Sequence, residues 1–120
     1  TAFFGQYDEQ FYTFATPYGH VFKLDAQSAR VTQLATLPLA KPELRSARFY
    51  VRDGYAYAIE PSEDGEAPPQ FSACRLSDGR CSTPKPLEGL EKKMRGSLLG
   101  GEQVLQSFAV RPGYIPDIDS

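Results

Sequence analysis

The chain has 120 residues and a mass of 13.3 kDa, with 13 Lys and Arg, 15 Asp and Glu, and a formal net charge of -2. This length fits one domain, predicted over residues 1–120. The small negative charge lacks the basic excess that nucleic acids and anionic membranes attract, and no apolar run is long enough to cross a bilayer, so we expect neither nucleic-acid binding nor membrane insertion.

Residue composition favours short strands over long helices. Seven Tyr and eight Phe favour strands, whereas ten Gly and ten Pro interrupt helices and supply turns. We therefore expect an all-β fold of tandem small antiparallel sheets. The units fall at roughly residues 3–37, 47–84 and 94–120, and a period of about 45 to 50 residues is typical of repeat architectures.

The first unit contains four short apolar and aromatic runs. We predict strands at Phe3–Tyr7, Phe11–Thr16, His20–Leu24 and Ala29–Leu34, with a turn at Pro17–Gly19. A connector over Leu37–Pro42 follows, since its two prolines exclude a central strand.

The second unit opens with the clearest hairpin in the chain. Apolar and polar residues alternate over residues 48–52 and again over residues 55–60, on either side of an Asp53-Gly54 turn. A polar loop runs from Pro61 to Pro69, and two further strands are predicted at residues 71–76 and 80–83.

The third unit is incomplete. Residues 87–94 are predicted to form a helical turn, which Gly89 weakens. A hairpin is predicted from residues 96–99 and 103–110 around a Gly-Gly turn, so only half a sheet remains.

The two cysteines are placed to form a disulfide. If residues 76–79 form a four-residue loop with Gly79 in the left-handed conformation, Cys74 lies directly opposite Cys81 and the two can bond. A three-residue loop would instead place Cys74 opposite Ser82 and strain the bond. We predict the disulfide, which indicates an oxidising compartment, either the periplasm or the cell exterior. The alternative is a pair of reduced, half-buried thiols in a cytosolic protein.

Catalytic signatures are missing from the sequence. His20 is the only histidine, so a His-dependent mechanism would need it beside a nucleophile such as Ser28 or Cys74 and an orienting carboxylate. No motif around any serine supports this, and a surface histidine at a strand end is the simpler interpretation. We therefore expect no enzyme activity, no catalytic residues, no metal and no cofactor.

The acidic loop of the second unit is the candidate binding element. Calcium could use its carboxylates, Glu60, Glu63, Asp64 and Glu66, but the spacing does not match an EF-hand. A proline-bounded acidic loop on a rigid sheet could instead enter the active-site cleft of an enzyme and block it, because the prolines limit the entropy lost on binding. The partner-binding residues predicted on this basis are Ser62, Glu63, Asp64, Gly65 and Glu66. An ordinary solvated loop is the alternative.

A similar motif occurs in the first two units, as Phe22-Lys23-Leu24-Asp25 followed by Ser28-Ala29-Arg30-Val31, and as Cys74-Arg75-Leu76-Ser77-Asp78-Gly79-Arg80. It resembles the hairpin of β-propeller blades, in which a strand end is followed by a polar turn and a basic residue. With too few units to close a ring, the chain is similar to the propeller-like periplasmic immunity proteins of bacterial type VI secretion. Those proteins bind a cognate peptidoglycan amidase and plug its Cys-His active site with a loop.

The resemblance implies an incomplete set of propeller-like blades in a periplasmic or secreted protein. It also implies an inhibitor or immunity protein that is a monomer when free and binds a cognate hydrolase or toxin, such as a cell-wall amidase. The alternative function is a non-catalytic fragment of a larger β-propeller, such as a sensor or envelope-assembly protein.

Overall fold

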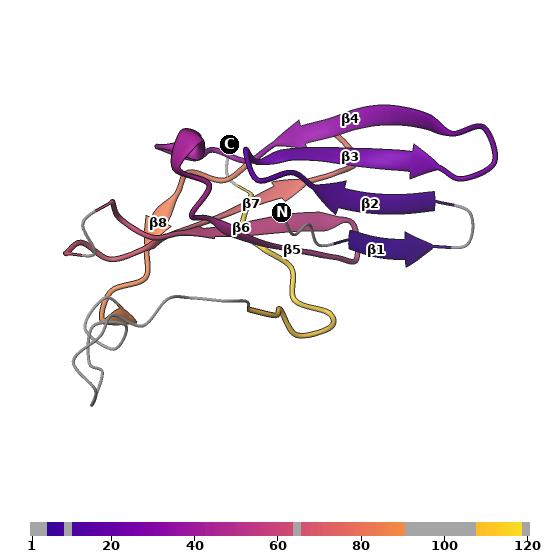
Figure 1. Cartoon of the computed structure of the whole chain (residues 1–120). Coiled ribbons are helices and arrows are strands. Elements are labelled where there is room, and N and C mark those ends of the chain that lie inside the picture. Colours follow the sequence, from indigo (N-terminus) through magenta and orange to yellow (C-terminus); the bar gives the residue numbers. More distant parts are fainter. Residues whose placement is uncertain (1–4, 9–10, 64–65, 91–107, 119–120) are drawn as a thin grey trace, which may run out of the picture.

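The computed structural model describes residues 5–8, 11–63, 66–90 and 108–118, which form two four-stranded antiparallel sheets (Figure 1). The first sheet contains β1 (Gly5–Asp8), β2 (Phe11–Ala15), β3 (His20–Asp25) and β4 (Arg30–Thr36). The second contains β5 (Arg48–Arg52), β6 (Tyr55–Glu60), β7 (Gln70–Arg75) and β8 (Lys85–Pro86). A short 3-10 helix, η1 (Pro42–Leu44), lies in the connection between them. The predicted all-β fold of small antiparallel sheets is confirmed.

Each sheet is a meander, in which every strand pairs with the next strand along the chain. The predicted hairpin of β5 and β6 is present, with Tyr50 opposite Tyr57. Its turn places Asp53 at φ 53° and Gly54 at φ 84°. Two consecutive positive φ angles match the right-handed twist of the flanking strands, which is why an Asp-Gly pair favours a tight hairpin here.

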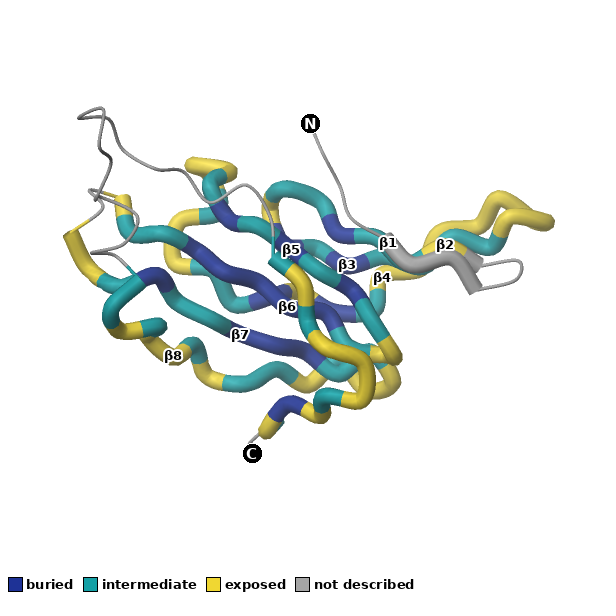
Figure 2. Tube along the Cα trace, turned by 90° about the horizontal axis from the view of Figure 1, so that it is seen from below, coloured by how far each residue is buried: buried dark blue, intermediate teal, exposed yellow. Residues whose placement is uncertain are grey.

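The two sheets pack face to face on a core rich in alanine. The buried residues of this core are Ala15, Val21, Ala35, Leu37, Ala47, Phe49, Val51, Ala56, Ala58 and Cys74. Across β5 and β6, Phe49 lies opposite Ala58 and Val51 lies opposite Ala56, so each larger side chain is matched by a small one. Such alternation lets side chains interdigitate without voids. Buried positions run along β5, β6 and β7 in Figure 2.

The hairpin that repeats in the sequence has the same backbone geometry in both sheets. The N–H of Ala29 donates to the carbonyl of Asp25, and the N–H of Gly79 donates to the carbonyl of Arg75, each at 2.8 Å. Ala29 and Gly79 both have positive φ angles, 57° and 76°. A turn carboxylate accepts a backbone hydrogen bond in each hairpin, from Gln27 at 3.0 Å in the first and from Arg80 at 3.1 Å in the second. The sequence repeat is therefore a structural repeat of the hairpin.

The predicted disulfide is present between Cys74 and Cys81. Arg75 N–H donates to the carbonyl of Arg80 at 2.7 Å, and Ser82 N–H donates to the carbonyl of Ala73 at 2.8 Å. These two bonds flank the cysteines, which therefore form a non-hydrogen-bonded pair, the kind in which side chains lie closest. The four-residue loop is confirmed.

The last strand of the second sheet differs from its prediction. A strand was expected at residues 80–83, but only an isolated bridge at Cys81 occurs there, and β8 follows at Lys85–Pro86. Pro84 and Pro86 lack the N–H groups that a continuous ladder needs, so pairing is limited to short contacts.

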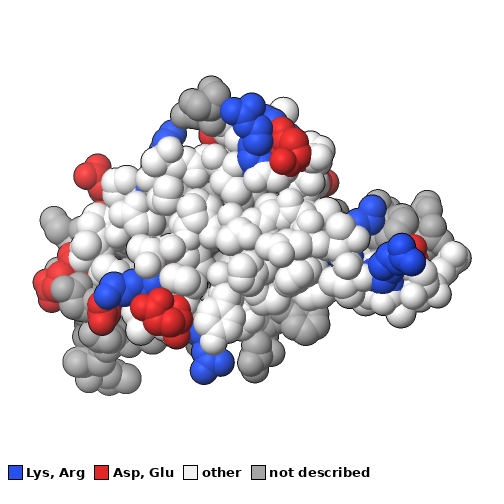
Figure 3. Space-filling view, turned by 90° about the horizontal axis from the view of Figure 1, so that it is seen from above, with Lys and Arg blue, Asp and Glu red and all other residues white. Residues whose placement is uncertain are grey.

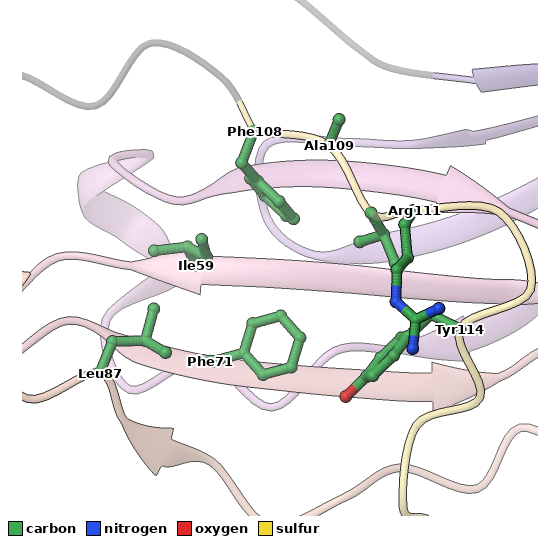
Figure 4. A pocket seen from close by; sticks show the side chains of 8 residues that line it. Ile59, Phe71, Leu87, Phe108, Ala109, Arg111 and Tyr114 are labelled. Carbon is green, nitrogen blue, oxygen red and sulfur yellow. The ribbon is translucent and has the colours of Figure 1, made fainter.

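The C-terminal segment is not a strand where it is described. Residues 91–107, which include half of the predicted helical turn and most of the predicted hairpin, lie outside the described residues. Residues 108–110, expected at the end of a strand, are irregular and lie over the outer face of the second sheet (Figure 4). The ring of Phe108 contacts Tyr50 with centroids 6.1 Å apart, which shows which face the segment covers.

Candidate functional site

The loop between β6 and β7 is fixed at its start by a buried carboxylate. Glu60 is 6% exposed, and its two carboxylate oxygens accept the backbone N–H groups of Ala40 at 2.8 Å and Lys41 at 2.9 Å. A buried charge is tolerated when hydrogen bonds replace its hydration. Glu60 therefore ties the base of the loop to the connector that joins the two sheets.

A second contact joins the same connector to the predicted partner-binding residues. The ammonium of Lys41 pairs with the carboxylate of Glu63 at 2.9 Å, although both side chains are more than half exposed. The hydrogen bond to Glu63, together with its charge, raises the pKa of Lys41. An exposed pair adds little to global stability, and here it places the side chain of Glu63 against the connector.

The far end of the loop is also held. Pro69 is fully buried, and its carbonyl accepts the N–H of Leu87 at 2.8 Å. Within the loop, the hydroxyl of Ser62 accepts the N–H of Ala67 at 3.3 Å. The described ends of the loop are therefore anchored to the connector on one side and to the residue after β8 on the other.

The predicted partner-binding residues are placed only in part. Ser62, Glu63 and Glu66 lie on the loop surface, whereas Asp64 and Gly65 lie outside the described residues. Glu60 does not belong with the solvated acidic residues, because its carboxylate is buried and already bonded. Within the described ranges, no group of three or more potential metal ligands is found. The alternation of β6, which places Glu60 on the same side as Ala56 and Ala58, was the sequence signal for its burial.

His20 lies at the first position of β3 in a network of neutral side chains. Its Nδ1 lies 3.4 Å from the hydroxyl of Thr36 and 3.3 Å from the amide nitrogen of Gln33. The nucleophiles considered with it are elsewhere, since Ser28 lies exposed in the turn after β3 and Cys74 is in the disulfide. Among the described residues, the components of a triad are not brought together around His20.

A pocket of about 310 Å³ opens between the outer face of the second sheet and the C-terminal segment (Figure 4). Ile59, Phe71 and Leu87 line it from the sheet side, and residues 108–111 and Tyr114 line it from the segment. Ile59 is the penultimate residue of β6 and Phe71 is the second residue of β7, so the pocket adjoins the base of the loop between these strands. Sequence reasoning missed this pocket because its walls are far apart in the chain.

Beside the pocket, Tyr57 lies at the centre of an aromatic cluster. Its ring is fully buried and contacts Phe71 and Tyr114, with centroids 6.0 and 6.1 Å away. Within the described part of the chain, its buried hydroxyl has no hydrogen-bond partner. Burial raises the pKa of Tyr57 to about 12. Tyr55 also contacts the ring of Tyr57, with centroids 6.5 Å apart, and Tyr50 contacts Phe108.

The outer face of the first sheet is apolar and partly exposed. Tyr12 and Val31 lie on either side of Leu24 and are 44% and 52% exposed. Next to them, the rings of Phe14 and Phe22 have centroids 5.7 Å apart. On the face seen in Figure 3, charged side chains of both signs lie mostly at the margins, without the broad basic patch that nucleic acids attract.

Comparisons with protein-family models, with curated proteins and with solved structures find no match. A search of the described residues for a helix both long and apolar enough to cross a membrane also finds none.

Proposed function

We propose that this protein is a non-catalytic inhibitor or immunity protein of the periplasm or cell exterior. It binds a partner enzyme that acts on the cell wall, a peptidoglycan amidase, and inserts the loop over residues 61–69 into the active site. The disulfide between Cys74 and Cys81 supports an oxidising compartment.

The anchoring of the loop at both ends carries this proposal. Glu60 and the Lys41–Glu63 pair hold the start of the loop, and buried Pro69 holds its end. A segment whose ends are already fixed loses less conformational entropy when a cleft closes around it. Inhibition by a protruding loop needs this property, because a flexible peptide that made the same contacts would lose more conformational entropy and bind more weakly.

The chemistry of the loop suits the active site of a hydrolase. Glu63 and Glu66 are exposed carboxylates, and Ser62 carries a hydroxyl. Such groups accept hydrogen bonds from an imidazolium or from the backbone N–H groups of an oxyanion hole. The loop thereby offers oxygen atoms where the enzyme normally binds a substrate carbonyl.

Affinity capture from an envelope extract tests the proposal. The wild-type protein should retain one hydrolase at equal stoichiometry, whereas Glu63→Lys and Asp64→Lys should retain less of it while keeping the fold. Arg30→Glu is the matched control, because Arg30 is an exposed charge in the β3–β4 hairpin, at the opposite end of the molecule from the loop (Figure 1). If both loop variants capture as much hydrolase as the wild type, the contact surface is not the loop.

A second candidate function is favoured by the exposed apolar face around Tyr12 and Val31. If the two meanders are propeller-like blades, this face is where a further sheet would pack, and the protein would be a non-catalytic part of a β-propeller sensor or envelope-assembly protein. Size in solution separates the two functions. An inhibitor is a monomer when free, whereas a propeller fragment self-associates through this face.

A further inference from the structure

The pocket beside the loop has walls that are held in place from both sides. Arg52, on β5, donates from its guanidinium to the carbonyl of Val110 at 3.2 Å, and its cation lies over the ring of Tyr50. Tyr114 packs against buried Tyr57 after a turn in which its N–H bonds the carbonyl of Arg111 at 3.3 Å. The C-terminal segment is thus anchored before and after Arg111, and the pocket is formed without a ligand.

The lining of the pocket selects for a particular chemistry. Among the described residues that line the pocket, Arg111 is the only charged one, and the others are aliphatic or aromatic. Among the described residues, the guanidinium of Arg111 has no ion pair, and its side chain extends beside Tyr114 at one end of the pocket (Figure 4). A guanidinium binds carboxylates through two parallel hydrogen bonds, while the rest of the lining favours an alkyl group.

The volume limits the size of the ligand. At about 310 Å³ the pocket lies at the small end of ligand sites, which run from about 300 to 1,000 Å³. This volume suits one short alkyl chain. The pocket adjoins the base of the loop, but its lining residues differ from the predicted partner-binding residues, so ligand binding can be measured separately from inhibition.

We propose that this pocket binds a medium-chain alkyl carboxylate, with the chain between Ile59, Phe71 and Leu87 and the carboxylate on Arg111. Binding would stabilise the C-terminal segment on the sheet, because the ligand contacts both walls. The negative charge of the ligand is required, so an alcohol or amine of the same chain length binds less well.

Titration with octanoate, followed by two-dimensional amide NMR and calorimetry, tests the proposal with the whole chain. We expect saturable one-to-one binding, with shifts at Ile59, Leu87 and Arg111, and weaker binding of 1-octanol and octylamine. Arg111→Gln should lower the affinity for octanoate about five- to tenfold, a modest factor because an exposed ion pair is partly screened. The affinity for octanol should stay unchanged. Arg30→Gln is the control and should bind octanoate like the wild type.

A second variant tests the pocket without removing the charge. Leu87→Trp should fill the pocket and abolish binding of octanoate while Arg111 remains. The proposal is overturned if the binding of octanoate does not saturate or if octanol binds equally well. It is also overturned if the amide chemical-shift changes map to Tyr12 and Val31 on the first sheet. It is also overturned if Arg111→Gln binds octanoate as the wild type does.

Discussion

The carboxylate of Glu60 accepts the backbone N–H of Lys41 at 2.9 Å, and this bond joins the end of β6 to the connector between the sheets. The side chain of the same lysine reaches Glu63 on the loop. Lys41 is therefore bonded through its backbone to a buried acid and through its side chain to an exposed one. The first contact is to a buried carboxylate, and the second lies at the surface between the connector and the loop.

Removing the buried acid should destabilise the protein. Glu60→Ala leaves the N–H groups of Ala40 and Lys41 without their acceptors, and we expect a loss of about 2 to 3 kcal/mol in the free energy of unfolding. Urea denaturation measures it. Glu88→Ala, an exposed acid after β8, is the control and should change stability by less than about 0.5 kcal/mol. An equally small effect of Glu60→Ala would show that the hydrogen bonds to Glu60 contribute nothing to stability.

The disulfide should stabilise the fold by limiting the unfolded chain. Cys74 and Cys81 are seven positions apart, and closing a loop of this length contributes about 2.5 kcal/mol by the chain-entropy estimate. The double variant Cys74→Ala, Cys81→Ala should lose that amount in chemical denaturation. Wild-type protein measured in dithiothreitol should show a similar loss, and unchanged stability in both would contradict the prediction.

Gly79 should be less tolerant of substitution than Gly54. Both have positive φ angles, 76° and 84°, but a Cβ at Gly79 would lie 2.9 Å from the carbonyl oxygen of Leu34, whereas one at Gly54 would meet nothing within 4 Å. Gly54→Ala should lower the free energy of unfolding by about 1 kcal/mol because of backbone strain alone. Gly79→Ala should lower it by about 1 to 2 kcal/mol more, because its Cβ also approaches the carbonyl of Leu34. Thermal unfolding compares the two variants. Equal losses would mean that the hairpin does not lie this close to β4.

The hydroxyl of Tyr57 should make stability fall in strong alkali. Its pKa is about 12 in the folded protein against 10.0 when unfolded, so the folded state holds the proton more tightly. The contribution of the protonated Tyr57 hydroxyl to the stability of the fold is fully present below pH 10 and is lost as the pH rises towards 12. Tyr57→Phe should reduce this loss of stability in alkali. At neutral pH its stability should equal that of the wild type or exceed it by up to about 1 kcal/mol, because the variant lacks the buried hydroxyl.

Tyr18→Phe is the control for this pH dependence, because Tyr18 is 47% exposed. Its stability between pH 10 and pH 12, measured by urea denaturation, should follow that of the wild type. If Tyr57→Phe and Tyr18→Phe give the same alkaline profile, the titration of Tyr57 is not the cause.

Local signals in the sequence predicted the hairpins well. The Asp53-Gly54 turn and the facing pair of Cys74 and Cys81 depend on residues close together in the chain, so periodicity and turn chemistry were sufficient. The limits of the last strand were missed because Pro84 and Pro86 interrupt its hydrogen bonding.

Contacts between distant residues were not predictable in the same way. The hydrogen bond that the N–H of Lys41 donates to Glu60 and the ring contact between Tyr57 and Tyr114 join different parts of the chain. The acidic character of residues 60–66 suggested one solvated group, but the pleat of β6 turns Glu60 inward. The partner-binding role of the loop stays a prediction.

An inhibition titration tests the central proposal most directly. The hydrolase captured from the envelope is assayed on peptidoglycan with increasing amounts of the wild-type protein, the Glu63→Lys, Asp64→Lys double variant, or Arg30→Glu. We predict that the wild type and Arg30→Glu abolish activity at one equivalent, and that the double variant does so only in large excess. Unchanged hydrolase activity at saturating wild-type protein, or equal inhibition by the double variant, would contradict the proposed role of the loop.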